Sequence, residues 1–159
     1  KSQVYHYFSD KTELVEAVVR AQIERVLGEQ APFLDDLRTM RGFERWRDAI
    51  VVGVRGWRGA HGCPMGSLAS EIAGRSETAR ENLQRGFSVW QHWFRLGLER
   101  MQDSGELRPD ADAEELAVGL MAAVQGGYLL VKTTRDERSM AIALDMALDS
   151  IRVALSAAE

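Results

Sequence analysis

The sequence predicts an all-α protein. Apolar residues recur with the 3.6-residue period of a helix along most of the chain, and runs that alternate between apolar and polar residues are nearly absent. Prolines are also rare, with three in 159 residues, while 45% of the residues are hydrophobic. A chain of this length and composition is expected to form one globular core without disulfides or structural metals.

The first predicted helix begins after Asp10. An aspartate there accepts a backbone hydrogen bond as an N-cap, and Glu13 stands at the spacing of a capping box. We expect this helix to end at about Gly28, because glycine commonly follows a helix C-terminus, and Pro32 lies just beyond.

Two further helices are predicted before residue 75. An apolar stripe from about Gly42 to Trp57 predicts a helix that ends in the glycine-containing segment 59–62. The segment 63–66 is interpreted as a turn, and a short helix follows it as far as Gly74.

Three longer helices are predicted in the second half. The first begins at a Ser76 cap, spans about 27 residues and is apolar on two sides, so it should be packed on both. Asp112 and Glu115 repeat the capping-box spacing and begin a helix with almost no charge before Lys132. The last helix is expected at roughly 137–157.

The last two predicted helices carry patterns typical of close helix pairing. One has small residues three or four positions apart, including adjacent glycines that cost about 1 kcal/mol each relative to alanine. The other has apolar residues at spacings of three and four. Burial within one chain is an alternative, but we expect a homodimer in which these helices form a four-helix bundle with their symmetry mates. The expected interface residues are Gly119, Ala123, Gly127, Met140, Leu144, Ala147, Leu148, Ile151 and Leu155.

Large apolar side chains on the central helices indicate a ligand cavity, since such cavities are lined mainly by aromatic and aliphatic groups. Gln125 lies midway along an uncharged helix, where an unpaired amide would cost about 1–3 kcal/mol. Either a ligand or an internal partner should therefore satisfy it, and plain core packing is the alternative for each aromatic residue. The expected lining residues are Trp57, Met65, Phe87, Trp90, Phe94, Met121, Gln125 and Tyr128, with His61, Cys63, Glu71 and His92 as weaker candidates.

Catalysis and metal binding have little support in the sequence. The three histidines fall in separate segments without a metal-ligand spacing, and the glycines of 53–62 lack the Lys-Ser/Thr ending of a phosphate loop. Cys63 and His61 could form a nucleophilic pair, but no third residue is available to orient the base. We expect no enzyme, no metal site and no cofactor.

Charge and cysteine content constrain partners and location. The net charge of −4 argues against the whole chain being a nucleic-acid grip, and only a local basic patch could serve that purpose. A single cysteine fits a reducing compartment, so a cytoplasmic location is expected. No unbroken apolar run reaches the length of a membrane span, and no membrane partner is expected.

The segment 2–14, SQVYHYFSDKTEL, resembles the stretch that closes the DNA-binding domain in the TetR family of transcriptional repressors. In that family an aliphatic residue, a tyrosine and an aromatic pair end the recognition helix, and a lysine and a leucine open the next helix. His6 and Tyr7 appear in the reverse of the common order. The matching residues in this chain are Val4, Tyr5, Tyr7, Phe8, Lys11 and Leu14.

The resemblance implies a TetR-repressor-like C-terminal domain of about seven helices, the last two of which form the dimer bundle. Residues 1–9 would be the remnant of a helix-turn-helix domain whose earlier helices precede Lys1. Residues 10–159 would form the ligand-binding and dimerisation domain, with 10–28 as the connecting helix. Gln3 could reach a base edge while other residues contact phosphates. The expected DNA-binding residues are Lys1, Ser2, Gln3, Tyr5, His6, Tyr7 and Lys11.

The function that the resemblance implies is ligand-responsive repression. A small apolar or aromatic effector would bind the helical core of each protomer, move the helix at 10–28 and release the dimer from operator DNA. Operator binding is expected of the full-length protein only. The alternative is a helical enzyme or interaction module that uses the same cavity.

Overall fold

A computed structural model of the chain describes residue 8, residues 10–56 and residues 62–156. These residues form six α-helices and no strand, which confirms the all-α prediction. The count is close to the expected seven. The helices are α2 (Lys11–Leu34), α3 (Met40–Gly56), α4 (Pro64–Ile72), α5 (Glu77–Asp103), α6 (Ala113–Thr134) and α7 (Arg138–Val153).

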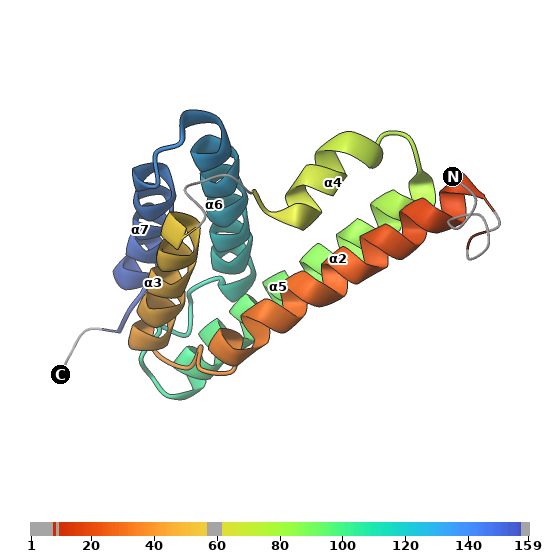
Figure 1. Cartoon of the computed structure of the whole chain (residues 1–159). Helices are drawn as coiled ribbons and strands as arrows, with labels where there is room; N and C mark the ends of the chain where they lie inside the picture. Colours follow the sequence, from red (N-terminus) through yellow and green to blue (C-terminus); the bar gives the residue numbers. More distant parts are fainter. Residues whose placement is uncertain (1–7, 9, 57–61, 157–159) are drawn as a thin grey trace.

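The two longest helices, α2 and α5, lie side by side and run in the same direction (Figure 1). The short helix α4 packs against both of them near their first halves (Figure 1). Helices α3, α6 and α7 gather near the other end, where α6 contacts α5 and α7 contacts α3. The most extensive contact joins α6 to α7. Helices α4 and α6 therefore contact α5 at different places along its length.

Three helix starts are capped as the sequence predicts. The side-chain oxygens of Asp10, Ser76 and Asp112 accept hydrogen bonds from backbone amides three residues further on, at 2.9, 3.2 and 3.0 Å. An N-cap of this kind stabilises a helix by about 1 kcal/mol. The starts of α2, α5 and α6 are thus determined by local sequence.

Helix α2 does not end at Gly28, as predicted, but continues to Leu34 with Pro32 inside its last turn. Pro32 has no amide to donate to the Gly28 carbonyl, and the buried Leu34 attaches the extension to the core. The turn predicted at 63–66 is also corrected, because α4 begins at Pro64, a residue favoured in the first turn of a helix.

Helix α7 ends at Val153, four residues before the predicted end. The chain beyond it leaves the helix because it pairs with the loop between α5 and α6. The Arg108 amide donates to the Ala154 carbonyl at 3.0 Å, and the Ser156 amide donates to the Glu106 carbonyl at 2.9 Å. The end predicted for α3, at 59–62, falls mostly outside the described residues, and the helix is described as far as Gly56.

Helices α6 and α7 of the same chain pack closely against each other. Gly127 lets the helices approach closely, because a Cβ atom there would lie 2.6 Å from the Met140 sulfur. Four residues expected at a subunit interface are fully buried within the protomer and leave no surface for a partner: Met140, Leu144, Leu148 and Ile151. The structure places these four residues and Gly127 in the packing between α6 and α7 of one chain.

Helix α6 is long and apolar enough to cross a membrane by length and composition, with a mean hydropathy of 1.4 over its best 18 residues. The core helix of a soluble protein passes the same test, and α6 packs against α5 and α7. This helix is weak evidence for a membrane span.

Candidate functional site

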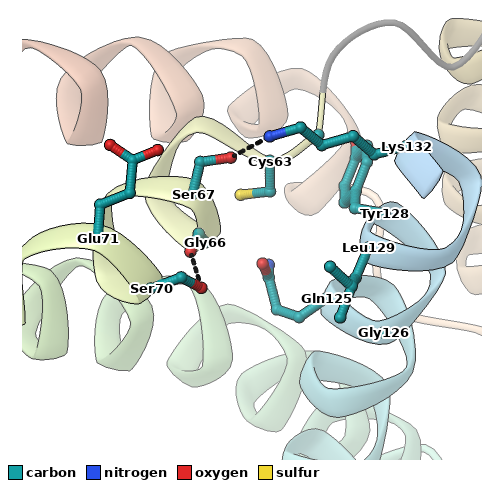
Figure 2. A pocket seen from close by; sticks show the side chains of 11 residues that line it. Cys63, Gly66, Ser67, Ser70, Glu71, Gln125, Gly126, Tyr128, Leu129 and Lys132 are labelled. Carbon is teal, nitrogen blue, oxygen red and sulfur yellow. Dashed lines mark hydrogen bonds between the residues drawn. The ribbon is translucent and has the colours of Figure 1, made fainter.

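A cavity of about 350 Å³ lies between α4 and α6. We name it the α6 lobe. Figure 2 shows its polar side chains, which come from one face of α4 and from the C-terminal half of α6. The lining residues are Gly62, Cys63, Gly66, Ser67, Ser70, Glu71, Gln125, Gly126, Tyr128, Leu129 and Lys132.

A second cavity of about 290 Å³ adjoins the first and faces α2. We name it the α2 lobe. The two lobes share Gly62, Cys63 and Tyr128, so these residues stand between them. The other lining residues of the α2 lobe are Arg25, Val26, Glu29, Gln30, Pro64 and Trp90. Residues of α2, α4, α5 and α6 therefore meet around one divided space.

Gln125 has an incompletely satisfied amide inside the α6 lobe. Its Nε2 atom lies 3.8 Å from the Met121 sulfur, and the amide also interacts with the Cys63 thiol; hydrogen bonds to sulfur are weak. Its Oε1 atom lies close to α4, since a Cβ atom at Gly66 would come within 2.6 Å of it. Figure 2 shows the amide pointing across the gap toward Gly66 and Cys63. The absence of a side chain at Gly66 creates the space that the amide occupies.

Lys132 crosses from α6 to α4 at the edge of the same lobe (Figure 2). Its Nζ atom lies 3.4 Å from the Ser67 hydroxyl. Among the described residues, no carboxylate forms an ion pair with this ammonium group. Lys132 is thus a cation beside the cavity whose only described hydrogen-bond partner is a neutral hydroxyl.

Cys63 and Tyr128 separate the lobes as uncharged groups. Burial raises the pKa of the Cys63 thiol above its ordinary value, although backbone amides of Gly66 and Met65 and the Gln125 amide oppose this effect. Burial also raises the pKa of the Tyr128 hydroxyl, and the nearby Cys63 and Glu29 add to the increase. Both groups stay protonated at neutral pH and can donate hydrogen bonds to a bound molecule.

The structure brings only some of the expected lining residues to the cavity. Gln125 and Tyr128 line the α6 lobe, and Trp90 and Tyr128 line the α2 lobe. Met65, Phe94 and Met121 are buried in the core, while Phe87 is half-buried against it. Trp57 lies outside the described residues.

The structure places two of the four weaker lining candidates at the cavity. Cys63 and Glu71 do line the cavity, whereas His92 contacts Arg95 on the surface and His61 lies outside the described residues. Sequence reasoning missed the small and polar lining of α4, including Gly66 and Ser67, and the polar residues of α2. Small residues on the cavity face of α4 are a usable signal, because they leave room beside a helix.

The expected DNA-binding residues fall almost entirely outside the described residues. Lys1, Ser2, Gln3, Tyr5, His6 and Tyr7 are among the residues that the structure does not describe. Lys11 is exposed and is the first residue of α2. The described residues contain no cluster of three or more His, Cys, Asp or Glu side chains that could hold a metal ion.

A family model and a curated protein resemble this chain in sequence. A family model described as the C-terminal domain of tetracyclin repressor-like proteins matches residues 42–147. The HTH-type transcriptional repressor DhaR of Mycobacterium sp. strain GP1 is 25% identical over 142 residues, which cover 88% of this chain and 70% of that protein.

Solved structures share the fold. A TetR-family regulator from Cytophaga hutchinsonii superposes with a TM-score of 0.81 at 17% identity, covering 99% of this chain and 80% of that one. The regulatory protein TetR from Rhodobacter sphaeroides gives a TM-score of 0.76 at 21% identity, covering 94% and 80% of the two chains. At these identities the likeness concerns the fold alone.

Proposed function

Because the chain belongs to the TetR family of transcriptional regulators, we propose that its effector binds the two joined lobes between α2, α4 and α6 and thereby controls DNA binding. Ligand-responsive repression is the general function of this family, and its members are transcriptional regulators rather than enzymes. TetR-family regulators are soluble cytoplasmic proteins, and we propose the same location for this one.

The observation that carries the proposal is the underpaired polar lining between α4 and α6. The Gln125 amide is held by weak contacts with the sulfur atoms of Met121 and Cys63, and Lys132 crosses the gap to a neutral hydroxyl. A ligand that supplies hydrogen bonds to buried or half-buried polar groups of this kind stabilises the complex. A bound molecule would therefore alter how α4 and α6 are held relative to each other.

The packing of α4 provides a route from the cavity to the DNA-binding segment. Helix α4 contacts α2 and α5, and α2 also lines the α2 lobe with Arg25, Val26, Glu29 and Gln30. Helix α2 begins at Lys11, directly after the segment that resembles the end of a recognition helix. If α4 can occupy two positions, a ligand that binds one of them more tightly would favour that position. The change would shift α2 and the DNA-binding segment together. We propose that residues 1–9 belong to a helix-turn-helix DNA-binding domain and that residues 10–159 form the regulatory domain.

Family members act as DNA-binding, ligand-responsive dimers. In this chain we propose that the interface is the exposed face of α6 and α7. A groove of about 860 Å³ runs between these helices and includes Gly119, Ala123 and Ala147 from the expected interface. Leu155, also expected there, is half-buried and pairs with Leu107 instead. Apolar side chains that remain exposed on the two helices are Val118, Leu129, Leu130, Ile142, Met146 and Val153.

The proposed function predicts that Gln125→Leu weakens the response to effector while leaving DNA binding intact. The test uses full-length protein and labelled DNA from upstream of its own gene, with small aromatic and carbonyl compounds first selected by thermal shift. Compounds that release the wild-type protein from DNA should need about tenfold higher concentration with Gln125→Leu, because the amide hydrogen bonds to the ligand are lost. Anisotropy of the labelled DNA measures the release.

The matched control is Gln84→Leu, an exposed position on α5 away from both lobes. It should respond as the wild type does. Equal effector concentrations for the wild type and Gln125→Leu, in a variant whose folding is unchanged, would exclude the α6 lobe as the effector site.

A further inference from the structure

One buried hydrogen-bond donor beside the cavity has no partner in the part of the chain that the structure describes. Trp90 lies on α5, is 1% exposed and lines the α2 lobe. Among the described residues, no atom accepts a hydrogen bond from its indole Nε1–H group. Nearly all buried N–H groups in folded proteins are paired, because an unpaired one costs free energy.

A second tryptophan in the same core shows that the fold can satisfy such a group. Trp46 is also fully buried and, like Trp90, has Phe94 as its aromatic neighbour. Its Nε1–H group donates to the Gln30 side-chain oxygen at 3.0 Å. The two indoles differ in that Trp90 lies at the cavity, where the missing acceptor can come from a bound molecule.

The remaining groups of the α2 lobe favour an uncharged ligand. The Tyr128 hydroxyl and the Cys63 thiol are neutral donors, because burial raises the pKa of each. Arg25 and Glu29 lie 3.5 Å apart as an ion pair, and both side chains are more than half exposed. Their opposite charges largely cancel within the lobe, so it carries several neutral donors and no net charge.

We propose that the α2 lobe binds a small neutral molecule that carries a hydrogen-bond acceptor, such as a ketone, amide or ether oxygen, and that Trp90 donates to this acceptor. Val26 and Pro64 supply apolar surface for the rest of the molecule, and the lobe has room for one substituted aromatic ring. The inference rests on the proposed function, because it specifies the chemical class of the effector.

Two probes of nearly the same shape test the inference. Acetophenone has a carbonyl acceptor, and ethylbenzene replaces it with a methylene group. Each probe is titrated into the ¹⁵N-labelled full-length protein while the indole N–H resonances of the tryptophans are recorded. Acetophenone should move the Trp90 indole proton downfield as a new hydrogen bond forms, and ethylbenzene should not produce this downfield shift at equal occupancy.

The variant Trp90→Phe assigns the resonance and removes the donor. The ratio of the ethylbenzene to the acetophenone dissociation constant should be about three- to tenfold larger in the wild type than in Trp90→Phe, the range for one neutral hydrogen bond. Each ratio compares two probes in the same protein. A loss of protein stability that weakens the binding of both probes equally therefore leaves the ratio unchanged. Trp93→Phe, a half-buried position on the same helix that lines neither lobe, should keep the wild-type ratio.

Three results would overturn the inference: no saturable binding of either probe, an unmoved Trp90 indole proton at saturating acetophenone, or equal ratios in the wild type and Trp90→Phe. These outcomes are independent of DNA release. If acetophenone binds through Trp90 but never alters operator binding, the ligand class stands and the proposed regulatory function fails.

Discussion

The residues between the two lobes are largely buried and carry hydrogen-bond donors. Tyr128 and Cys63 are held neutral in the fold, and Gln125 has room only because residue 66 is a glycine. Such a lining discriminates ligands by hydrogen bonding, since an apolar molecule would leave these groups unpaired.

The raised pKa values predict how stability depends on pH. Unfolded thiols titrate near 9.0 and unfolded phenols near 10.0. In the folded chain both groups lose their protons only at higher pH, so their contribution is complete below pH 9 and is lost as pH rises further. For Tyr128 the free energy of unfolding should fall by at most about 1.4 kcal/mol per pH unit above pH 10.

Urea unfolding between pH 8 and 11 measures this dependence. The variant Tyr128→Phe cannot ionise at that position, so its stability should fall less steeply above pH 10 than that of the wild type. Parallel curves for the two proteins would show that the Tyr128 pKa is not raised by folding.

At the scale of the helices, several starts follow from local sequence, while ends and lining residues depend on distant contacts. The caps at Asp10, Ser76 and Asp112 involve residues three positions apart, so the sequence could predict them. Gly28 was expected to end a helix, but the contact of Leu34 with the core extends it.

The candidate site was only partly predictable for the same reason. Gln125 could be identified because a polar residue stood alone in an uncharged helix. Trp90 and Phe94 have the same apolar character in sequence, and only the packing of α2, α4 and α6 places one at a cavity and the other in the core. The spacing of Met140 and Leu144 suits paired helices whether the partner is intrachain or a second subunit, and the structure pairs them within the chain.

Two glycines in long helices should respond oppositely to alanine. A Cβ atom at Gly97 would lie 2.5 Å from the Leu37 backbone oxygen, so α5 would have to move away from that loop. Gly97→Ala should therefore destabilise the protein by about 1–3 kcal/mol. Gly28→Ala meets no atom within 4 Å and should stabilise α2 by up to about 1 kcal/mol.

Thermal unfolding of both variants checks this prediction. At this chain length 1 kcal/mol corresponds to a change in Tm of about 2–4 °C. A Tm for Gly97→Ala at or above the wild-type value would show that the close contact between α5 and Leu37 is absent.

At the scale of the whole molecule, the acidic net charge is compatible with a DNA-binding regulator. Lys1 is the only charged residue among residues 1–9, so all of the acidic residues lie in 10–159, the proposed regulatory domain, and the residues expected to contact DNA lie at its N-terminal edge. Helix α2 connects that edge to the cavity, and the exposed face of α6 and α7 is proposed to join two such units. The central claim is that a ligand between α4 and α6 changes the position of α2 in both protomers.

The most direct test is the distance between the two α2 helices in the full-length dimer. A spin label at the exposed Thr12→Cys of α2, with the buried Cys63 left in place, allows double electron–electron resonance to measure this distance with and without a compound that releases DNA. We predict a shifted distance distribution in the otherwise unsubstituted protein and no shift at the same concentration with Gln125→Leu. Release from DNA with an unchanged distance, or no intersubunit distance at all, would contradict the account.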